Sequence, residues 1–335
     1  MSAVPQGAKY LVIGSNSFSG ASFADYALER GASVTGVSRS PQPHPVFLPY
    51  RWAPRPGSFT FHQLDLNRDL DAIMQLVDSE QPEYVVNFAA QSMVAESWKN
   101  PEHWFMTNCV SSVRLHDRLR HCASLRKYVH VTTPEVYGRT EGAIREDAPF
   151  WPSTPYAVSR AAGDMSLRSF FEAYRFPVVF TRAANVYGPG QQLYRIVPRT
   201  ILFILTGRKL QLHGGGQSRR SFIHIRDVSE ATWRIARNAP AGETYHISTG
   251  EVVTIRALVE RLCAKLGADF DGCVEVVGER LGKDSAYALD SAKLRSALGW
   301  RDAIGLDAGL DECVRWVRDN LDVLKAQPLD YVHRP

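Results

Sequence analysis

A glycine-rich turn near the start of the sequence stands where a phosphate-bearing ligand is usually held. The run Gly14-Ser-Asn-Ser-Phe-Ser-Gly20 lies between a predicted buried strand, Tyr10–Ile13, and a predicted helix, Ala21–Arg30. Glycines let the backbone approach phosphates, and the helix N-terminus attracts a pyrophosphate. Ser17 replaces the middle glycine of the usual pattern, so a tight structural turn is the alternative interpretation. The position between strand and helix favours dinucleotide binding, through Gly14, Asn16, Ser17, Phe18 and Gly20.

The end of the next predicted strand, Ser33–Val37, bears on which dinucleotide is bound. It is followed by Ser38, Arg39 and Ser40, with no acidic residue to hold the ribose 2′-hydroxyl of NAD. A cation flanked by hydroxyls suits the 2′-phosphate of NADP, so we expect NADP, with NAD as the alternative. A solvated arginine at a strand end is the structural interpretation. Asp65 and Leu66, at the end of the third predicted strand, are expected to contact the adenine.

The elements around these turns alternate strand and helix, which is typical of a parallel sheet. The predicted strands are Tyr10–Ile13, Ser33–Val37, Phe59–Leu64, Tyr84–Asn87, Lys127–Val131 and Val178–Arg182. The predicted helices are Ala21–Arg30, Leu70–Ser79, Pro101–Cys122 and Tyr156–Tyr174. Six prolines between Arg39 and Ser58 predict an extended surface loop.

The second half mixes shorter elements and predicts a smaller domain. Its predicted strands are Leu210–His213, Thr244–Ile247, Val274–Val277 and Tyr287–Leu289, and its helices lie near Val197–Leu205, Asp227–Asn238, Ile255–Leu266 and Leu306–Asn320. We therefore expect an α/β protein: a Rossmann-type doubly wound parallel sheet with a smaller mixed α/β C-terminal substrate domain. The dinucleotide-binding domain is expected to span 1–186 plus about 223–250, and the substrate domain 187–222 and 251–335.

Composition excludes several classes of protein. The 335 residues carry a formal net charge of +4 and 44% hydrophobic residues, as expected for a globular protein. No dense basic run points to nucleic acid, no apolar stretch is long enough for a membrane span, and Met1–Lys9 lacks the core of a secretory signal. The five cysteines form no C-x-x-C pair, which predicts reduced thiols in the cytoplasm and no metal site.

Four further segments point together to one family. In order they are Asn87–Ser92, Thr132–Gly138, Ser153–Arg160 and Asn185–Pro189. Together they resemble the extended short-chain dehydrogenase/reductase family that acts on nucleotide sugars, and the similarity is greatest to the 4,6-dehydratases for dTDP-glucose and GDP-mannose. The resemblance runs from Tyr10 to about Trp300.

The resemblance implies roles for individual residues. Tyr156 would take the proton of the sugar C4 hydroxyl during hydride transfer, Thr133 would hydrogen-bond the sugar O4, and Glu135 would remove the C5 proton. A phenol has a pKa near 10, so a nearby cation is needed to favour phenolate. Arg160 shares one helical face with Tyr156 and stands where the family has lysine. Ala89 and Ala90 are expected to contact the cofactor.

Pro134 leaves the reaction type open. The dTDP-glucose enzymes have an aspartate before the glutamate, whereas the GDP-mannose enzymes also lack it, so Glu135 could act as base and then as acid. Dehydration is the leading hypothesis. A 4-epimerase, a C4 dehydrogenase or a C5 epimerisation through Glu135 is the alternative, and a non-catalytic dinucleotide-binding sensor is the third.

Substrate binding and assembly are also implied by the resemblance. The expected substrate is a nucleotide-diphosphate sugar, contacted by Gln91, Ser92, Asn185, Arg220 and Arg280. Arginines suit a pyrophosphate because they pair with it in a bidentate manner. A homodimer is expected through Pro101–Cys122 and Tyr156–Tyr174, which carry apolar residues on more than one face.

Overall fold

The seven-stranded sheet of the chain is wholly parallel. The computed structural model describes residues 7–139, 142–278 and 288–334. Its strands are β1 (Lys9–Ile13), β2 (Ser33–Ser38), β3 (Ser58–Gln63), β4 (Tyr84–Asn87), β5 (Lys127–Thr132), β7 (Val178–Ala183) and β12 (Thr244–Ile247). Their order is β12-β7-β5-β4-β1-β2-β3, so the direction of winding reverses between β1 and β4. Ligands bind at such a reversal in doubly wound folds, and the predicted fold class is confirmed.

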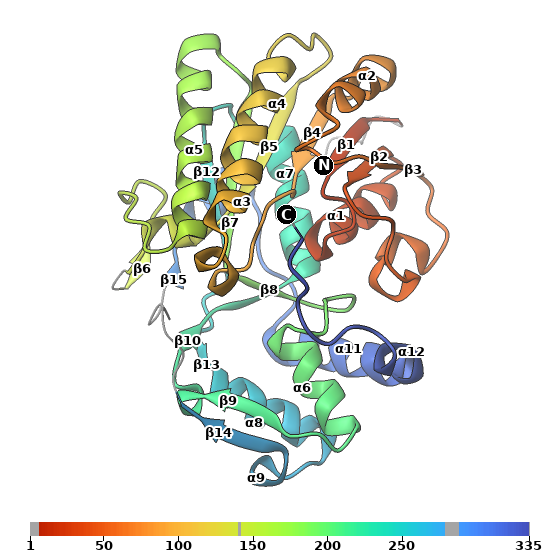
Figure 1. The fold of residues 1–335 in the computed structure, drawn as a ribbon, viewed down its shortest axis with the longest axis vertical. Coiled ribbons are helices and arrows are strands. Elements are labelled where there is room, and N and C mark those ends of the chain that lie inside the picture. Colours follow the sequence, from red (N-terminus) through yellow and green to blue (C-terminus); the bar gives the residue numbers. More distant parts are fainter. Residues whose placement is uncertain (1–6, 140–141, 279–287, 335) are drawn as a thin grey trace.

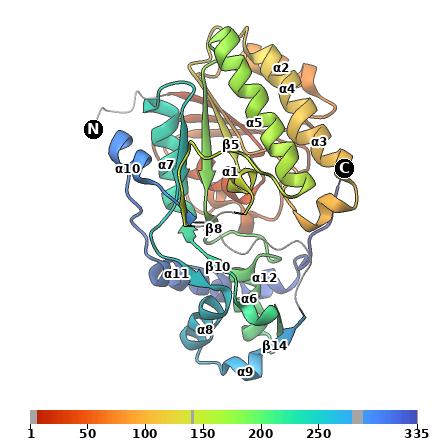
Figure 2. The same cartoon turned by 90° about the vertical axis from the view of Figure 1, so that its left-hand side faces the viewer.

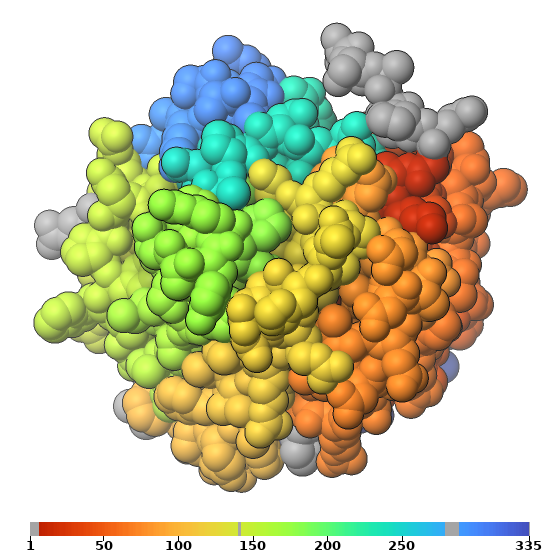
Figure 3. All heavy atoms as spheres, turned by 90° about the horizontal axis from the view of Figure 1, so that it is seen from above, coloured from red at the N-terminus to blue at the C-terminus, as the bar shows by residue number. Residues whose placement is uncertain are grey.

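Helices cover both faces of this sheet. On one face, α1 (Phe18–Leu28) and α7 (Ile225–Asn238) pack in one apolar core with β1 and β4. On the other face, α2 (Leu70–Glu80), α4 (Ser112–Leu119) and α5 (Pro155–Tyr174) share a second core with β1 and β5. These helices lie side by side in Figure 2, and seen from above they form neighbouring orange, yellow and green bands (Figure 3). We call the sheet and these helices the upper lobe.

A lower lobe has cores of its own (Figure 1). It consists of α6 (Ile196–Leu205), α8 (Ile255–Leu266), α9 (Phe270–Cys273), α11 (Leu306–Asp319), α12 (Leu321–Lys325) and the parallel pair β9 (Leu210–His213) and β14 (Val274–Val277). Short strand pairs lie between the lobes: β8 (Asn185–Tyr187) with β11 (Phe222–His224), and β10 (Arg219–Arg220) with β13 (Val253–Thr254). The pair β6 (Ala143–Ile144) and β15 (Ala288–Leu289) completes the sheets; the rest of the predicted strand Tyr287–Leu289 lies outside the described residues.

The proline-rich segment 39–58 is not the extended surface loop that its composition predicts. It forms two 3-10 turns, η1 (Pro45–Phe47) and η2 (Pro49–Arg51), each with proline at its start, where a fixed φ and a missing N–H are tolerated. Val46 and Phe47 are buried in the core of the lower lobe, whereas Leu48 and Tyr50 are buried in the core of the upper lobe. The segment therefore joins the two lobes.

The predicted helix Pro101–Cys122 is not continuous. It is divided into α3 (Pro101–Phe105), the π-helical segment η4 (Met106–Ser111) and α4. Within η4 the buried Asn108 side chain donates to the Gln91 carbonyl oxygen and to Ser159 Oγ, both at 3.0 Å. Single-turn π segments are frequent at functional sites.

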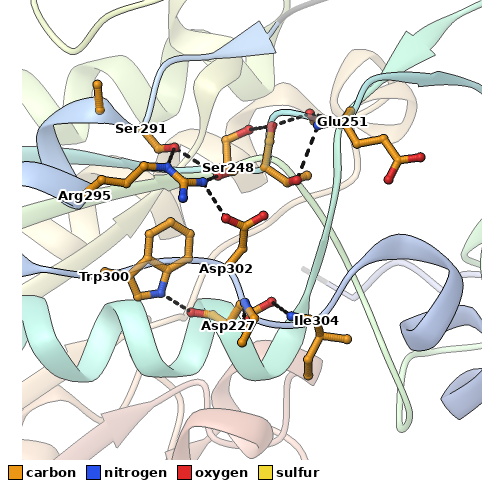
Figure 4. A network of polar contacts seen from close by, with 12 residues as sticks. Asp227, Ser248, Glu251, Ser291, Arg295, Trp300, Asp302 and Ile304 are labelled. Carbon is orange, nitrogen blue, oxygen red and sulfur yellow. Dashed lines mark hydrogen bonds and ion pairs between the residues drawn. The ribbon is translucent and has the colours of Figure 1, made fainter.

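The N-terminal turn of α7 holds the chain that follows α10 (Ala292–Leu298) (Figure 4). The two carboxylate oxygens of Asp227 accept hydrogen bonds from the backbone N–H groups of Ala303 (3.0 Å) and Ile304 (3.1 Å). The indole N–H of the fully buried Trp300 donates to the Asp227 carbonyl oxygen at 3.1 Å. This network fixes the upper lobe to the loop that leads into α11.

Elsewhere the described residues contain η3 (Ala95–Trp98), η5 (Pro134–Tyr137) and η6 (Gly214–Gly216). Across the described residues, no helix combines the length and the apolar character that crossing a membrane requires.

Candidate active site

The glycine-rich turn is closed so tightly that glycine is required at both ends. Gly14 has φ +83°, and a Cβ there would lie 2.7 Å from the Ala89 nitrogen. A Cβ on Gly20 would lie 2.2 Å from the Gly14 carbonyl oxygen. Ser17 caps α1: its hydroxyl donates to the Gly14 carbonyl oxygen at 2.7 Å and accepts from the Gly20 N–H at 3.0 Å. Ser17 can therefore replace the missing glycine because its hydroxyl is used within the turn.

The turn is also attached to the end of β2. The Asn16 N–H donates to Ser38 Oγ at 3.0 Å, and Asn16 Nδ2 donates to the carbonyl oxygens of Ser40 (2.8 Å) and Pro41 (3.1 Å). These contacts place Arg39, between the two serines, beside the phosphate-binding turn.

One cavity of about 870 Å³ runs from this turn across the carboxyl ends of β1, β4 and β5. Apart from Gly20, every predicted site residue within the described ranges lines it; Arg280 lies outside those ranges. The predicted lining residues are Gly14, Asn16, Ser17, Phe18, Ser38, Arg39, Ser40, Asp65, Leu66, Ala89, Ala90, Gln91, Ser92, Thr133, Glu135, Tyr156, Arg160, Asn185 and Arg220. The sequence prediction did not include Thr107, Tyr194 and Arg195, which line the cavity as well.

Three of the four predicted catalytic side chains, those of Thr133, Glu135 and Tyr156, meet where η5 faces the start of α5; the fourth, Arg160, lies one turn further along α5. Thr133 caps η5, and its Oγ1 accepts the Glu135 N–H at 3.3 Å. Tyr156 lies in the first turn of α5, which begins at Pro155 and is capped by Thr154. Thr133 lies near enough to Tyr156 for its hydroxyl to lower the pKa of the phenol. The 3-10 turn after β5 and the start of α5 thus bring these side chains together, although Thr133 and Tyr156 are 23 positions apart in sequence.

The groups around Tyr156 shift the pKa of its phenol in opposite directions. Burial raises the pKa of Tyr156, and the negative charge of Glu135 raises it further. The positive charge of Arg160, the hydroxyl of Thr133 and the charge of Arg195 lower this pKa. The net direction is upward, so the phenol is protonated at neutral pH unless a further positive charge arrives beside it.

Arg160 is buried one helical turn after Tyr156. It is 2% exposed and donates a hydrogen bond to the Val131 carbonyl oxygen. Its buried Nε has no hydrogen-bond partner among the residues that the structure describes. A ribose hydroxyl would supply such an acceptor, so Arg160, together with the glycine cradle, fits a dinucleotide.

Behind Arg160 lies a buried charged group. Asp164 Oδ2 accepts from Arg182 at 2.7 Å, and Asp164 Oδ1 lies 3.3 Å from His130 Nε2. Burial alone would raise the pKa of Asp164, but Arg182, His130 and Arg160 outweigh it and lower this pKa to about 2. Burial lowers the pKa of His130, which is therefore neutral. The group contains two buried cations, Arg160 and Arg182, and one buried anion, Asp164.

The predicted substrate residues lie around the other end of the cavity. Asn185 Nδ2 donates to the Ser221 carbonyl oxygen at 3.3 Å, and Arg220 donates to the Arg219 carbonyl oxygen at 2.8 Å. The Gln91 N–H donates to Asn108 Oδ1 at 2.8 Å, whereas Gln91 Nε2 donates to the Arg334 carbonyl oxygen at 2.7 Å. The side-chain amide N–H of Gln91 is thus used by a distant part of the chain, which the sequence did not predict.

The fold and this site define a nicotinamide-dependent enzyme of the extended short-chain dehydrogenase/reductase type. Residues 11–313 match a family model described as GDP-mannose 4,6 dehydratase. The chain is 35% identical over 238 residues to a dTDP-glucose 4,6-dehydratase of Streptomyces niveus, which is 70% of each protein. It is 31% identical over 258 residues to the human dTDP-D-glucose 4,6-dehydratase, covering 75% of this chain and 73% of the human one. The chain therefore belongs to the family of nucleotide-sugar 4,6-dehydratases.

Solved structures agree with this assignment. The dTDP-glucose 4,6-dehydratase DesIV of Streptomyces venezuelae, with NAD bound, superposes with a TM-score of 0.85 at 30% identity, covering 94% of this chain and 98% of that one. A UDP-glucose 4-epimerase of Thermotoga maritima, with UDP-glucose, superposes with a TM-score of 0.84 at 26% identity, covering 93% and 99%.

Proposed function

We propose that the chain converts a nucleotide-diphosphate hexose, with dTDP-glucose as the first candidate, to its 4-keto-6-deoxy derivative with loss of water. The observation that carries this proposal is the meeting of Thr133, Glu135 and Tyr156 in the cavity that also holds the dinucleotide turn. Relatives named for dTDP-glucose support the choice of substrate. The described residues include a second hollow of about 770 Å³, which shares Tyr194, Ile196 and Ile255 with the first and has room for the nucleotide.

The residues divide the chemistry between them. A nicotinamide dinucleotide, which the glycine-rich turn and Arg160 would hold, would supply the hydride acceptor for oxidation at C4 and the hydride donor for reduction at C6. Tyr156 takes the proton of the C4 hydroxyl while Thr133 holds O4. The C4 ketone acidifies the C5 proton, Glu135 removes it, and the same carboxyl then protonates the C6 hydroxyl, which leaves as water. When hydride is added to C6, C5 takes a proton from solvent, and Tyr156 releases to solvent the proton that it took from the C4 hydroxyl. Glu135 serves both steps because Pro134 has no ionisable group.

We also propose NADP as the preferred dinucleotide. Ser38, Arg39 and Ser40 line the cavity at the end of β2, where the sequence has no carboxylate to hold the 2′-hydroxyl of NAD. NAD is the alternative, because it is the cofactor named in the solved structures that resemble this chain.

We propose further that two copies pair through α3–α5. Large apolar side chains are exposed along these helices, which otherwise cover the sheet: Phe105, Met106, Val110, Val158, Met165 and Tyr174. Exposed apolar patches of this kind mark protein interfaces.

We also propose that the protein works in a reducing compartment such as the cytoplasm, because all five cysteines are free thiols.

The proposed reaction is tested with Glu135→Gln and Tyr156→Phe and dTDP-glucose. Glu135→Gln should still form reduced cofactor but lose elimination by about 10²–10⁴-fold, because one acid–base group performs both later steps. Tyr156→Phe should abolish both the formation of reduced cofactor and the elimination of water. The readouts are single-turnover absorbance of the nicotinamide, deuterium incorporation at C5 and product mass. Product of unchanged mass with inverted C4 would assign a 4-epimerase instead, and water loss at the wild-type rate by Glu135→Gln would contradict the role of Glu135.

A further inference from the structure

Residues 329–334 form a strap between the two lobes. Figure 1 shows this dark-blue segment leaving α12 in the lower lobe and rising to the level of α3 in the upper lobe. At its lower end, Leu329 packs against both cores of the lower lobe, and Asp330 Oδ1 accepts from Arg199 of α6 at 2.8 Å. Its lower end is thus fixed by apolar packing and an ion pair.

Its upper end is fixed differently, by aromatic and polar contacts. The His333 ring stacks on His103 and on Trp104, with centroids 5.2 Å and 4.8 Å apart, and His333 Nε2 lies 2.9 Å from His103 Nδ1. One residue further, the Arg334 carbonyl oxygen accepts from Gln91 Nε2. Gln91 lines the cavity, so the strap is attached to the wall of the active site.

Between its two ends the strap lies beside the residues that would face the bound dinucleotide. The Tyr331 ring packs edge-on against Tyr194, a residue shared by both hollows. Burial raises the pKa of Tyr331, and the positive charges of Arg39 and Arg195 oppose it. Burial also lowers the pKa of His333, with His103 and Arg39 acting in the same direction. The charges of Arg39 and Arg195 thus act on the strap, and the charge of Arg195 also acts on Tyr156.

We propose that the 329–334 strap is a clasp that retains the dinucleotide between turnovers. The inference rests on the proposed function in one respect. A dehydratase that returns its hydride within each cycle regenerates the oxidised cofactor, so the cofactor need not leave. Among the described residues, the upper contacts of the clasp are made with His103, Trp104 and Gln91, so opening releases these contacts and needs no rearrangement of either core. The sugar nucleotide enters while the clasp is shut.

The test is the dissociation rate of the cofactor, which needs no sugar substrate. His333→Ala and Tyr331→Ala are loaded with fluorescent NADPH, or with NADH if that binds more tightly, and chased with excess oxidised cofactor. We expect each to release it about tenfold faster than the wild type, the change that a loss of about 1.4 kcal/mol produces. The matched control is Val332→Ala, because Val332 lies between them in sequence but is 68% exposed.

A second substitution at His333 controls for a local loss of structure in the alanine variant. His333→Phe keeps an aromatic ring on Trp104 and removes the hydrogen bond to His103, so its release rate should lie between those of the wild type and His333→Ala. Release within about twofold of Val332→Ala by both alanine variants would overturn the proposal, since such a ratio is worth well under 1 kcal/mol. So would unchanged release with an altered KM for the sugar nucleotide, which would make the strap a substrate gate. Failure to turn over dTDP-glucose would contradict the proposed function and leave this measurement standing.

Discussion

Arg182 donates a 2.7 Å hydrogen bond to Asp164, and the two side chains are only 3% and 2% exposed. Asp164 stands one helical turn after Arg160, on the helix that carries Tyr156. The Asp164 carboxylate pairs with Arg182 through one oxygen and lies 3.3 Å from His130 Nε2 through the other. The helix that carries Tyr156 is therefore attached to β7 by a buried ion pair and not by apolar packing alone.

Asp164→Asn should lower the free energy of unfolding by about 3–5 kcal/mol, because it leaves Arg182 charged and buried without its partner. Asp71 provides a matched control. It pairs with Arg118 at 2.9 Å but is 85% exposed, so Asp71→Asn should cost about 0–1 kcal/mol. Urea unfolding of both variants measures the difference. Equal losses of unfolding free energy in the two variants would show that burial does not decide how much an ion pair contributes to stability.

The same carboxyl predicts how stability depends on pH. The pKa of Asp164 is about 2 in the folded chain against an ordinary value of 3.8, so its charged form is favoured by folding. Its contribution is therefore complete above pH 3.8 and is lost as the pH falls towards 2. Unfolding measured across this range should show a steeper loss for the wild type than for Asp164→Asn.

Arg160 is predicted to set the pH at which Tyr156 acts. Since Arg160 lowers the pKa of Tyr156, Arg160→Met should raise the pH at which hydride transfer reaches half its maximum. Below the pKa, each unit of upward shift slows this step about tenfold. Arg160→Lys keeps the charge and should leave the profile closer to the wild type. Single-turnover nicotinamide absorbance against pH checks this, and identical profiles for Met and Lys would rule the prediction out.

Arg39 is predicted to discriminate between the two dinucleotides. A charged hydrogen bond contributes about 1.5–3 kcal/mol, so Arg39→Ala should weaken NADP by about 10–100-fold and leave NAD little changed. Calorimetric titration of the wild type and the variant with NADP and with NAD measures the ratio of the two dissociation constants. Equal affinity of the wild type for NAD and NADP would remove the basis for NADP as the preferred cofactor.

The proposed dimer predicts that one charge on α5 is enough to separate the copies. Met165 is 64% exposed among the apolar side chains of α3–α5, and Met165→Glu would place a charge in the interface. Val276→Glu is the control, because Val276 is 59% exposed on β14 in the lower lobe. Light scattering should give a dimer for the wild type and control and a monomer for Met165→Glu. A monomeric wild type would contradict the dimer itself.

The sequence was most informative where the chemistry is local. The strand ends and the turns beside them identified the residues that line the cavity, because parallel strands bring their carboxyl ends to one edge. Features made by distant contacts were not predicted. The prolines of 45–51 start 3-10 turns buried by both lobes, and Asn108 in the π segment bonds to Gln91 and Ser159. His103 and His333 meet across 230 positions, for which no periodicity or motif gives a signal.

The path of the chain between the lobes limits how this protein could be recombined with its relatives. The chain passes from β8 down to α6, returns to the sheet for α7 and β12, descends again for α8, and returns once more for α10 before α11 and the strap. A swap of substrate specificity by exchanging the lower lobe would therefore need several junctions. A fragment ending at residue 186 would also present the bare edge of β7, from which β12 is missing, and such edges pair with other chains. Hybrid enzymes with new sugar preferences should be sought by changing side chains in the cavity and not by grafting whole lobes.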